Sequence, residues 1–249
     1  MSFTLSDQHV EDFHTLGYTV FEQILPATLI RDLRLAADLA RDLAREKAGA
    51  QTQRLQPVGD FDIEQQPFID YAELPELLDA IHQVLSPAHT HGDRQHLGIL
   101  LEPADLPYCT HWHRDWRDNI YGLDLDQWET NYRDPDLLNQ VNCALYEDSS
   151  TWVVPGSHLR RDLAERADLS ASTSSACRGR GSCIWQRGIS ASIETPCGTS
   201  ATTSHTGDVA TLHDSVYTPA YREWSPREVI AANERRAAGA EMSNPNFRN

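Results

Sequence analysis

The hydrophobic periodicity of the chain changes near residue 96, and this change constrains the fold more than any other feature of the sequence. Upstream, apolar residues recur with a period near 3.6, which is typical of amphipathic helices that bury one face. Downstream, short apolar runs alternate with turn residues, which is typical of strands. The order predicts an α+β fold, with an antiparallel core and N-terminal helices packed on one side of it.

Helix boundaries are predicted from capping residues. Ser6 is the expected N-cap of a first helix that Gly17 ends, and Pro26 begins a second helix that ends at Gly49. The apolar repeat of the second helix comprises Leu29, Ile30, Leu33, Leu35, Ala36, Leu39 and Leu43. Further helices are expected over residues 74–85 and 227–238, and the predicted strands are 18–21, 96–101, 108–116, 141–146 and 152–154.

Length and charge limit the classes of function. The 249 residues are expected to form a single domain over 1–249, with a loose tail at 240–249. A formal net charge of -16 argues against nucleic-acid binding, because that affinity comes from basic side chains that neutralise phosphates. No apolar run is long enough to span a bilayer, and the first residues do not resemble a signal peptide, so we expect a cytoplasmic protein with no membrane partner. The five cysteines include no C-x-x-C pair, which predicts free thiols in a reducing compartment.

The segment 108–116, YCTHWHRDW, contains the residues that best fit a metal site. Side chains two residues apart in a strand point to the same face, so His113 and Asp115 would converge, with His111 beside them. Two imidazoles and one carboxylate form the facial triad of non-haem iron(II) oxygenases. Three alternatives stay open: an ordinary surface strand, a helix that places His111 and Asp115 together, and a cupin-like site using all three residues.

Three segments together resemble the phytanoyl-CoA dioxygenase family. They are the opening LSDQHVEDFHTLGYTVF from Leu5, the HWHRDW strand, and the VPGSH turn that ends at His158. The resemblance covers about the first two-thirds of the chain. It implies a double-stranded β-helix (jelly-roll, cupin-like) core and a hydroxylase that uses Fe(II) and 2-oxoglutarate on a small organic substrate. It also implies that His113 and Asp115 bind iron.

Further residues are candidates for the co-substrate and substrate sites. Gln140 and Asn142, on the next predicted strand, are candidates for hydrogen bonds to 2-oxoglutarate, or are ordinary polar residues of a sheet. His111, Trp116 and Arg117 are candidates for the substrate side. Related halogenases replace the carboxylate ligand by a small residue, so Asp115 implies hydroxylation. His158 is expected to serve the turn and not a metal.

The sequence departs from the family where the second histidine ligand and the 2-oxoglutarate arginine should follow. Residues 170–206 contain 15 Ser or Thr, three cysteines and no Leu, Val, Phe or Tyr. Such a composition is unsuited to the inward face of jelly-roll strands. His205 lies inside this unusual segment, and His213 lies beyond the position expected for the second histidine ligand. Neither is therefore assigned as a ligand.

The segment 170–209 is either a disordered insertion or, as we favour, the product of a frameshift. Permitted codons for residues 194–209, started one base early, can encode RNTLWHIGNYVPYRRR, which supplies the missing histidine and arginines. The hypothesis is a one-base loss near residues 168–176 and a one-base gain near Val209, after which ATLHD resembles the family again. The alternative to an active oxygenase is a degenerate scaffold that binds a small molecule or partner without turnover.

Overall fold

The architecture was derived from a computed structural model. It describes residues 3–52, 54–91, 97–101, 138–146, 152–153, 155–159, 183–184, 188–192 and 210–220. The helices are α1 (Asp7–Leu16), α2 (Ala27–Ala48), α3 (Gln66–Ala72) and α4 (Pro75–Val84), with short 3-10 turns at Val58–Asp60 and Ser157–Leu159. The strands are β1 (Tyr18–Glu22), β2 (Arg54–Leu55), β3 (Thr90–His91), β4 (Gly98–Leu101), β5 (Leu138–Ala144), β6 (Trp152–Val153), β7 (Cys183–Ile184), β8 (Gly188–Ser192) and β9 (Ala210–Tyr217). The predicted strand 108–116 and helix 227–238 lie outside these ranges.

The predicted boundaries of α1 and α2 are confirmed. Ser6 is the N-cap of α1, where its backbone N–H donates to His9 Nδ1 at 3.0 Å, and Gly17 ends the helix with a φ of 88°. A left-handed backbone of this kind favours glycine, which has no Cβ to clash. Gly49 ends α2 with a φ of 92° and a ψ of 166°, a different conformation from that of Gly17 but one that also favours glycine. None of the described helices is long and apolar enough to cross a membrane.

The buried face of α2 differs from the predicted apolar repeat. Leu35 and Leu39 are 65% and 49% exposed, so their assignment to the apolar face was wrong. Leu35 lies about 200° around the helix from Leu33, which is fully buried. The residues that α2 buries are Leu29, Leu33, Ala36, Ala37, Ala40 and Ala44. The small side chains of the four alanines let this part of the helix lie close to its neighbours.

One mixed sheet forms the centre of the described structure. Its strand order is β1-β8-β5-β9-β4-β2, and β3 also pairs with β9. The pairs β5–β9, β4–β9, β2–β4 and β3–β9 are antiparallel, whereas β8 is parallel to both β1 and β5. The α+β class is therefore confirmed, and the sheet is antiparallel except around β8. Strands β7 and β8 both belong to the Ser/Thr-rich segment, and β7 pairs with β6 in a second small sheet.

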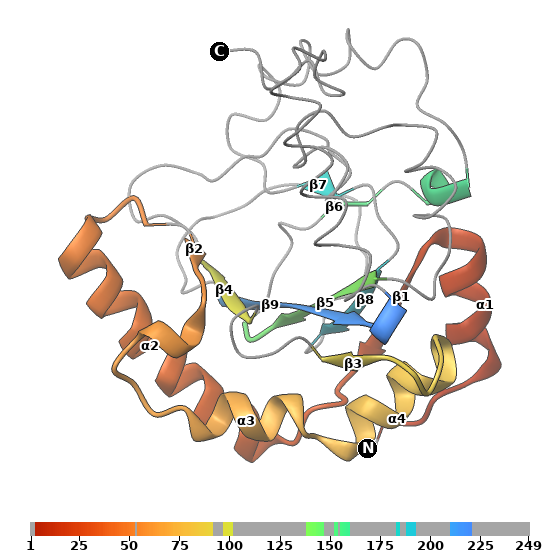
Figure 1. Ribbon diagram of the computed structural model, residues 1–249, viewed down its shortest axis with the longest axis horizontal. Coiled ribbons are helices and arrows are strands. Elements are labelled where there is room, and N and C mark those ends of the chain that lie inside the picture. The colour runs from red at the N-terminus through yellow and green to blue at the C-terminus, as the bar shows by residue number, and fades with distance from the viewer. Residues whose placement is uncertain are drawn as a thin grey trace, which may run out of the picture.

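The helices of the described residues cover one face of this sheet. Figure 1 shows α2, α3 and α4 along one side, with β6 and β7 on the other. The strand residues that pack into the helical core include Phe21, Ile99, Val141, Cys143, Leu212 and Val216, and Leu145, just after β5, packs there too. Because strand side chains alternate, the residues between them face away from the helices.

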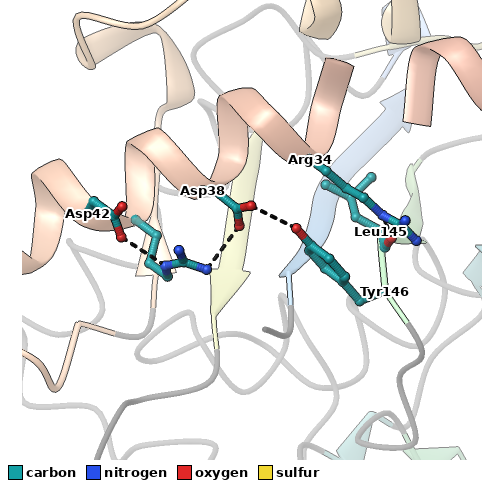
Figure 2. A network of polar contacts seen from close by, with 6 residues as sticks. Arg34, Asp38, Asp42, Leu145 and Tyr146 are labelled. Atoms are coloured by element: carbon teal, nitrogen blue, oxygen red, sulfur yellow. Dashed lines mark hydrogen bonds and ion pairs between the residues drawn. The ribbon is translucent and has the colours of Figure 1, made fainter. Parts of the chain in front are cut away.

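A polar network joins α2 to the end of β5 (Figure 2). Arg34 Nε donates to the Leu145 carbonyl at 2.5 Å, and its guanidinium lies 4.6 Å from the centroid of the Tyr146 ring. Tyr146 OH donates to Asp38 Oδ2 at 2.9 Å, and Arg41 binds the other oxygen of Asp38 at 2.9 Å. These contacts fix the position of β5, the strand that carries Gln140 and Asn142.

The VPGSH turn packs against the C-terminus of α1. Gly156 N donates to the Leu16 carbonyl at 2.7 Å, and His158 Nε2 lies 3.0 Å from the His14 carbonyl oxygen. A Cβ atom at Gly17 would lie 2.3 Å from His158 Nδ1. His158 therefore contacts the C-terminal end of α1.

We expect Gly17→Ala to destabilise the protein by roughly 2–5 kcal/mol, from left-handed backbone strain and overlap with the His158 ring. Urea unfolding measures the change. Adding His158→Ala to Gly17→Ala removes the overlap and should recover part of the loss. A Gly17→Ala cost that His158→Ala leaves unchanged would show that the two residues do not touch.

Candidate functional site

Polar side chains of β5 and β9 lie side by side on the face of the sheet opposite the described helices. Asn142 pairs with His213, Gln140 with Ser215, and Ala144 with Thr211. Directly paired residues of antiparallel strands project to the same face, so this register gathers Gln140, Asn142, Thr211, His213 and Ser215. Gln140 and Thr211 are only 7% and 6% exposed. The face is thus polar and, in part, closed to solvent.

Asn142 and His213 contact each other at the middle of this polar face. His213 Nδ1 lies 2.8 Å from Asn142 Oδ1, and both side chains are half-buried. Since the amide oxygen only accepts, Nδ1 carries the proton in this arrangement.

The predicted site residues divide into two groups. Gln140 and Asn142 are described, and the structure brings both to the polar face of β5. The other predicted residues, namely His111, His113, Asp115, Trp116 and Arg117, lie outside the described residues. The convergence of His113 and Asp115 is therefore still a prediction.

The polar groups on this face are of types that can bind a carboxylate or keto-acid. They do not by themselves form an iron site. Amide, hydroxyl and imidazole groups can hydrogen-bond such a ligand. Strands β5 and β9 contain no lysine or arginine to pair with a distal carboxylate. Within the described ranges, no group of three or more His, Cys, Asp or Glu residues could hold a metal ion.

A second polar cluster, which the sequence analysis missed, lies on the helix-covered face. His91 Nδ1 and Asp214 Oδ2 are 2.5 Å apart, with side chains 6% and 2% exposed. The Ser215 backbone N–H donates to the other carboxylate oxygen at 2.7 Å. The sequence of β9 contained a sign of this cluster, because Asp214 occupies a core-facing position between Leu212 and Val216. A buried carboxylate at such a position requires a partner.

Tyr71 and Cys143 lie beside this pair. Burial raises the pKa of the Cys143 thiol to about 12. Burial, and then the nearby Cys143 and Asp214, raise the pKa of Tyr71 well above its usual value. Both groups are therefore neutral at neutral pH, and Cys143 is not a nucleophile there.

We expect Cys143 to resist alkylation in the folded protein. At about pH 8 its raised pKa leaves almost no thiolate, and its side chain is buried. Iodoacetamide treatment followed by mass spectrometry should leave the Cys143 peptide unmodified, whereas the same peptide should react fully in concentrated urea. Rapid modification without denaturant would contradict the burial of this strand.

Comparison with protein-family models, curated proteins and solved structures finds no match for this chain. A functional assignment therefore rests on the motifs of the sequence and on the polar face of β5 and β9.

Proposed function

We propose that this chain has the scaffold of an iron(II)- and 2-oxoglutarate-dependent oxygenase of the phytanoyl-CoA dioxygenase family. The proposed core is a double-stranded β-helix, and the sheet described above is one wall of it. The proposed reaction is hydroxylation of a small organic substrate. In its present sequence the chain lacks the family's second-histidine and 2-oxoglutarate-arginine motif, so the alternative is a catalytically inactive member of the same scaffold.

The observation that supports this proposal best is the polar face of β5 and β9. A sheet with helices on one face is expected to expose the other to solvent or to use it to line a pocket. Here Gln140 and Thr211 are buried on the face away from the helices, beside the Asn142–His213 pair. Buried polar groups on an inward face are typical of a ligand pocket.

The residues of the chain have distinct roles in this proposal. His113 and Asp115 would hold the metal, and Gln140 and Asn142 would hydrogen-bond the co-substrate. When bound, iron(II) and 2-oxoglutarate supply the oxidising power for hydroxylation of a C–H bond. With only two protein ligands and no lysine or arginine on β5 or β9, the present chain would hold both groups weakly.

Two versions of the chain test the proposal. The first is the present sequence, and the second, the frame-corrected chain, has the missing base restored near residues 168–176 and the extra base removed near residue 209. Anaerobic calorimetric titration with 2-oxoglutarate in the presence of Fe(II) requires no knowledge of the substrate. We expect saturable binding and, in air, succinate release from the frame-corrected chain alone.

Comparison of the two chains also distinguishes an active oxygenase from a degenerate scaffold. Equal binding of 2-oxoglutarate by both chains, without succinate from either, would favour a degenerate scaffold that binds without turnover. The absence of lysine and arginine from β5 and β9 favours this alternative for the present sequence. Binding by neither chain would exclude the oxygenase assignment.

A further inference from the structure

Two polar atoms beneath the sheet are buried and have no hydrogen-bond partner among the described residues. They are His91 Nε2 on β3 and Tyr71 OH on α3. The two rings are in edge-to-face contact, with centroids 5.8 Å apart. Buried polar atoms in native proteins are nearly always hydrogen-bonded, and those without a protein partner usually bind an ordered water.

The orientation of His91 is fixed by Asp214. Its Nδ1 is bound to Asp214 Oδ2, so the ring cannot flip without breaking this contact and leaving a buried carboxylate oxygen without its partner. The other oxygen of Asp214 already accepts the Ser215 N–H. Nε2 needs a partner in either charge state of the ring, because it is a donor when protonated and an acceptor when neutral.

The surroundings define the chemistry of the ligand. Among the described residues, Cys143 on β5 and Asp214 on β9 act on Tyr71, and Asp214 also contacts His91 and is bonded at both oxygens. Among the described residues no donor set here could hold a metal ion. The ligand must both donate and accept hydrogen bonds, carry no net charge, and be small enough for a closed core. Water meets these conditions.

We propose that one buried water molecule bridges His91 Nε2 and Tyr71 OH, and thereby links α3 to the edge strand β3 under the central sheet. The proposal does not depend on the oxygenase assignment. It requires only residues of the α3, β3 and β9 elements.

The variant Tyr71→Phe tests this in the full chain. If a water binds both atoms, removal of the hydroxyl takes one partner from the water and lowers the urea midpoint of unfolding. If the site is dry, the variant removes a buried hydroxyl that has no partner, and the midpoint is unchanged or rises. An unchanged or raised midpoint therefore overturns the proposal.

A high-resolution crystal structure of the full chain provides the second measurement, since a direct Tyr71–His91 hydrogen bond would also lower the midpoint. We expect density for one water within hydrogen-bonding distance of both atoms, and its loss or displacement in Tyr71→Phe. A direct bond between the two side chains, or an empty contact, would contradict the bridge.

Discussion

Asp115→Ala in the frame-corrected chain lowers succinate release by more than about 100-fold, because loss of even an outer partner of a metal ligand typically costs about 10–100-fold. His113→Ala has the same effect for the same reason. Both residues are proposed to bind the metal directly, so their loss should weaken Fe(II) binding as well as turnover. Rates of succinate formation and calorimetric Fe(II) titrations measure the two effects separately.

His14→Gln is the matched control for loss of a histidine. His14 is exposed on α1 and takes part in the described contacts through its backbone carbonyl and the edge of its ring. We expect its variant to keep the activity of the parent chain. Turnover by Asp115→Ala within about tenfold of this control would exclude Asp115 as a metal ligand.

Asp214→Ala destabilises the protein by about 1–3 kcal/mol, because it leaves the buried His91 Nδ1 without its hydrogen-bond partner. Asp214→Asn should cost less, since its amide oxygen can still accept a hydrogen bond from His91 Nδ1–H. Urea unfolding of each variant gives the change in the free energy of unfolding.

Asp32→Ala is the control for removal of an aspartate from an ion pair. Asp32 contacts Arg31 at 2.9 Å, but the two side chains are 44% and 67% exposed. Solvent screening limits such a pair to about 0–1 kcal/mol. If Asp214→Ala costs no more than Asp32→Ala, the His91–Asp214 pair is not buried as described.

The elements that could be predicted from the sequence are those with clear local signals. Ser6, Gly17 and Gly49 mark helix ends because capping depends on neighbouring residues alone. Helix α3 was not predicted, because its seven residues are too few to show an apolar repeat. The exposed Leu35 and Leu39 show that an apolar count does not decide which face of a helix is buried.

Pairings between distant segments could not be predicted. The parallel placement of β8 between β1 and β5 depends on tertiary contacts that leave no local pattern. Gln140 and Asn142 are two residues apart, and their shared face follows from strand geometry. The His213 partner of Asn142 depends on the register of β5 against β9, which the sequence does not specify. His91 and Asp214 meet for the same reason, on the opposite face of β9.

The coding DNA from the codon of Val153 to the codon of Trp224 tests the central claim most directly. The account predicts one base missing near residues 168–176, one base extra near residue 209, and codons between them that encode the family-like string in the shifted frame. The frameshift is contradicted if the DNA confirms the present reading frame. In that case the codons for residues 194–209 could not encode RNTLWHIGNYVPYRRR in the shifted frame. The present sequence would then be genuine, and the chain would be expected to bind without turnover.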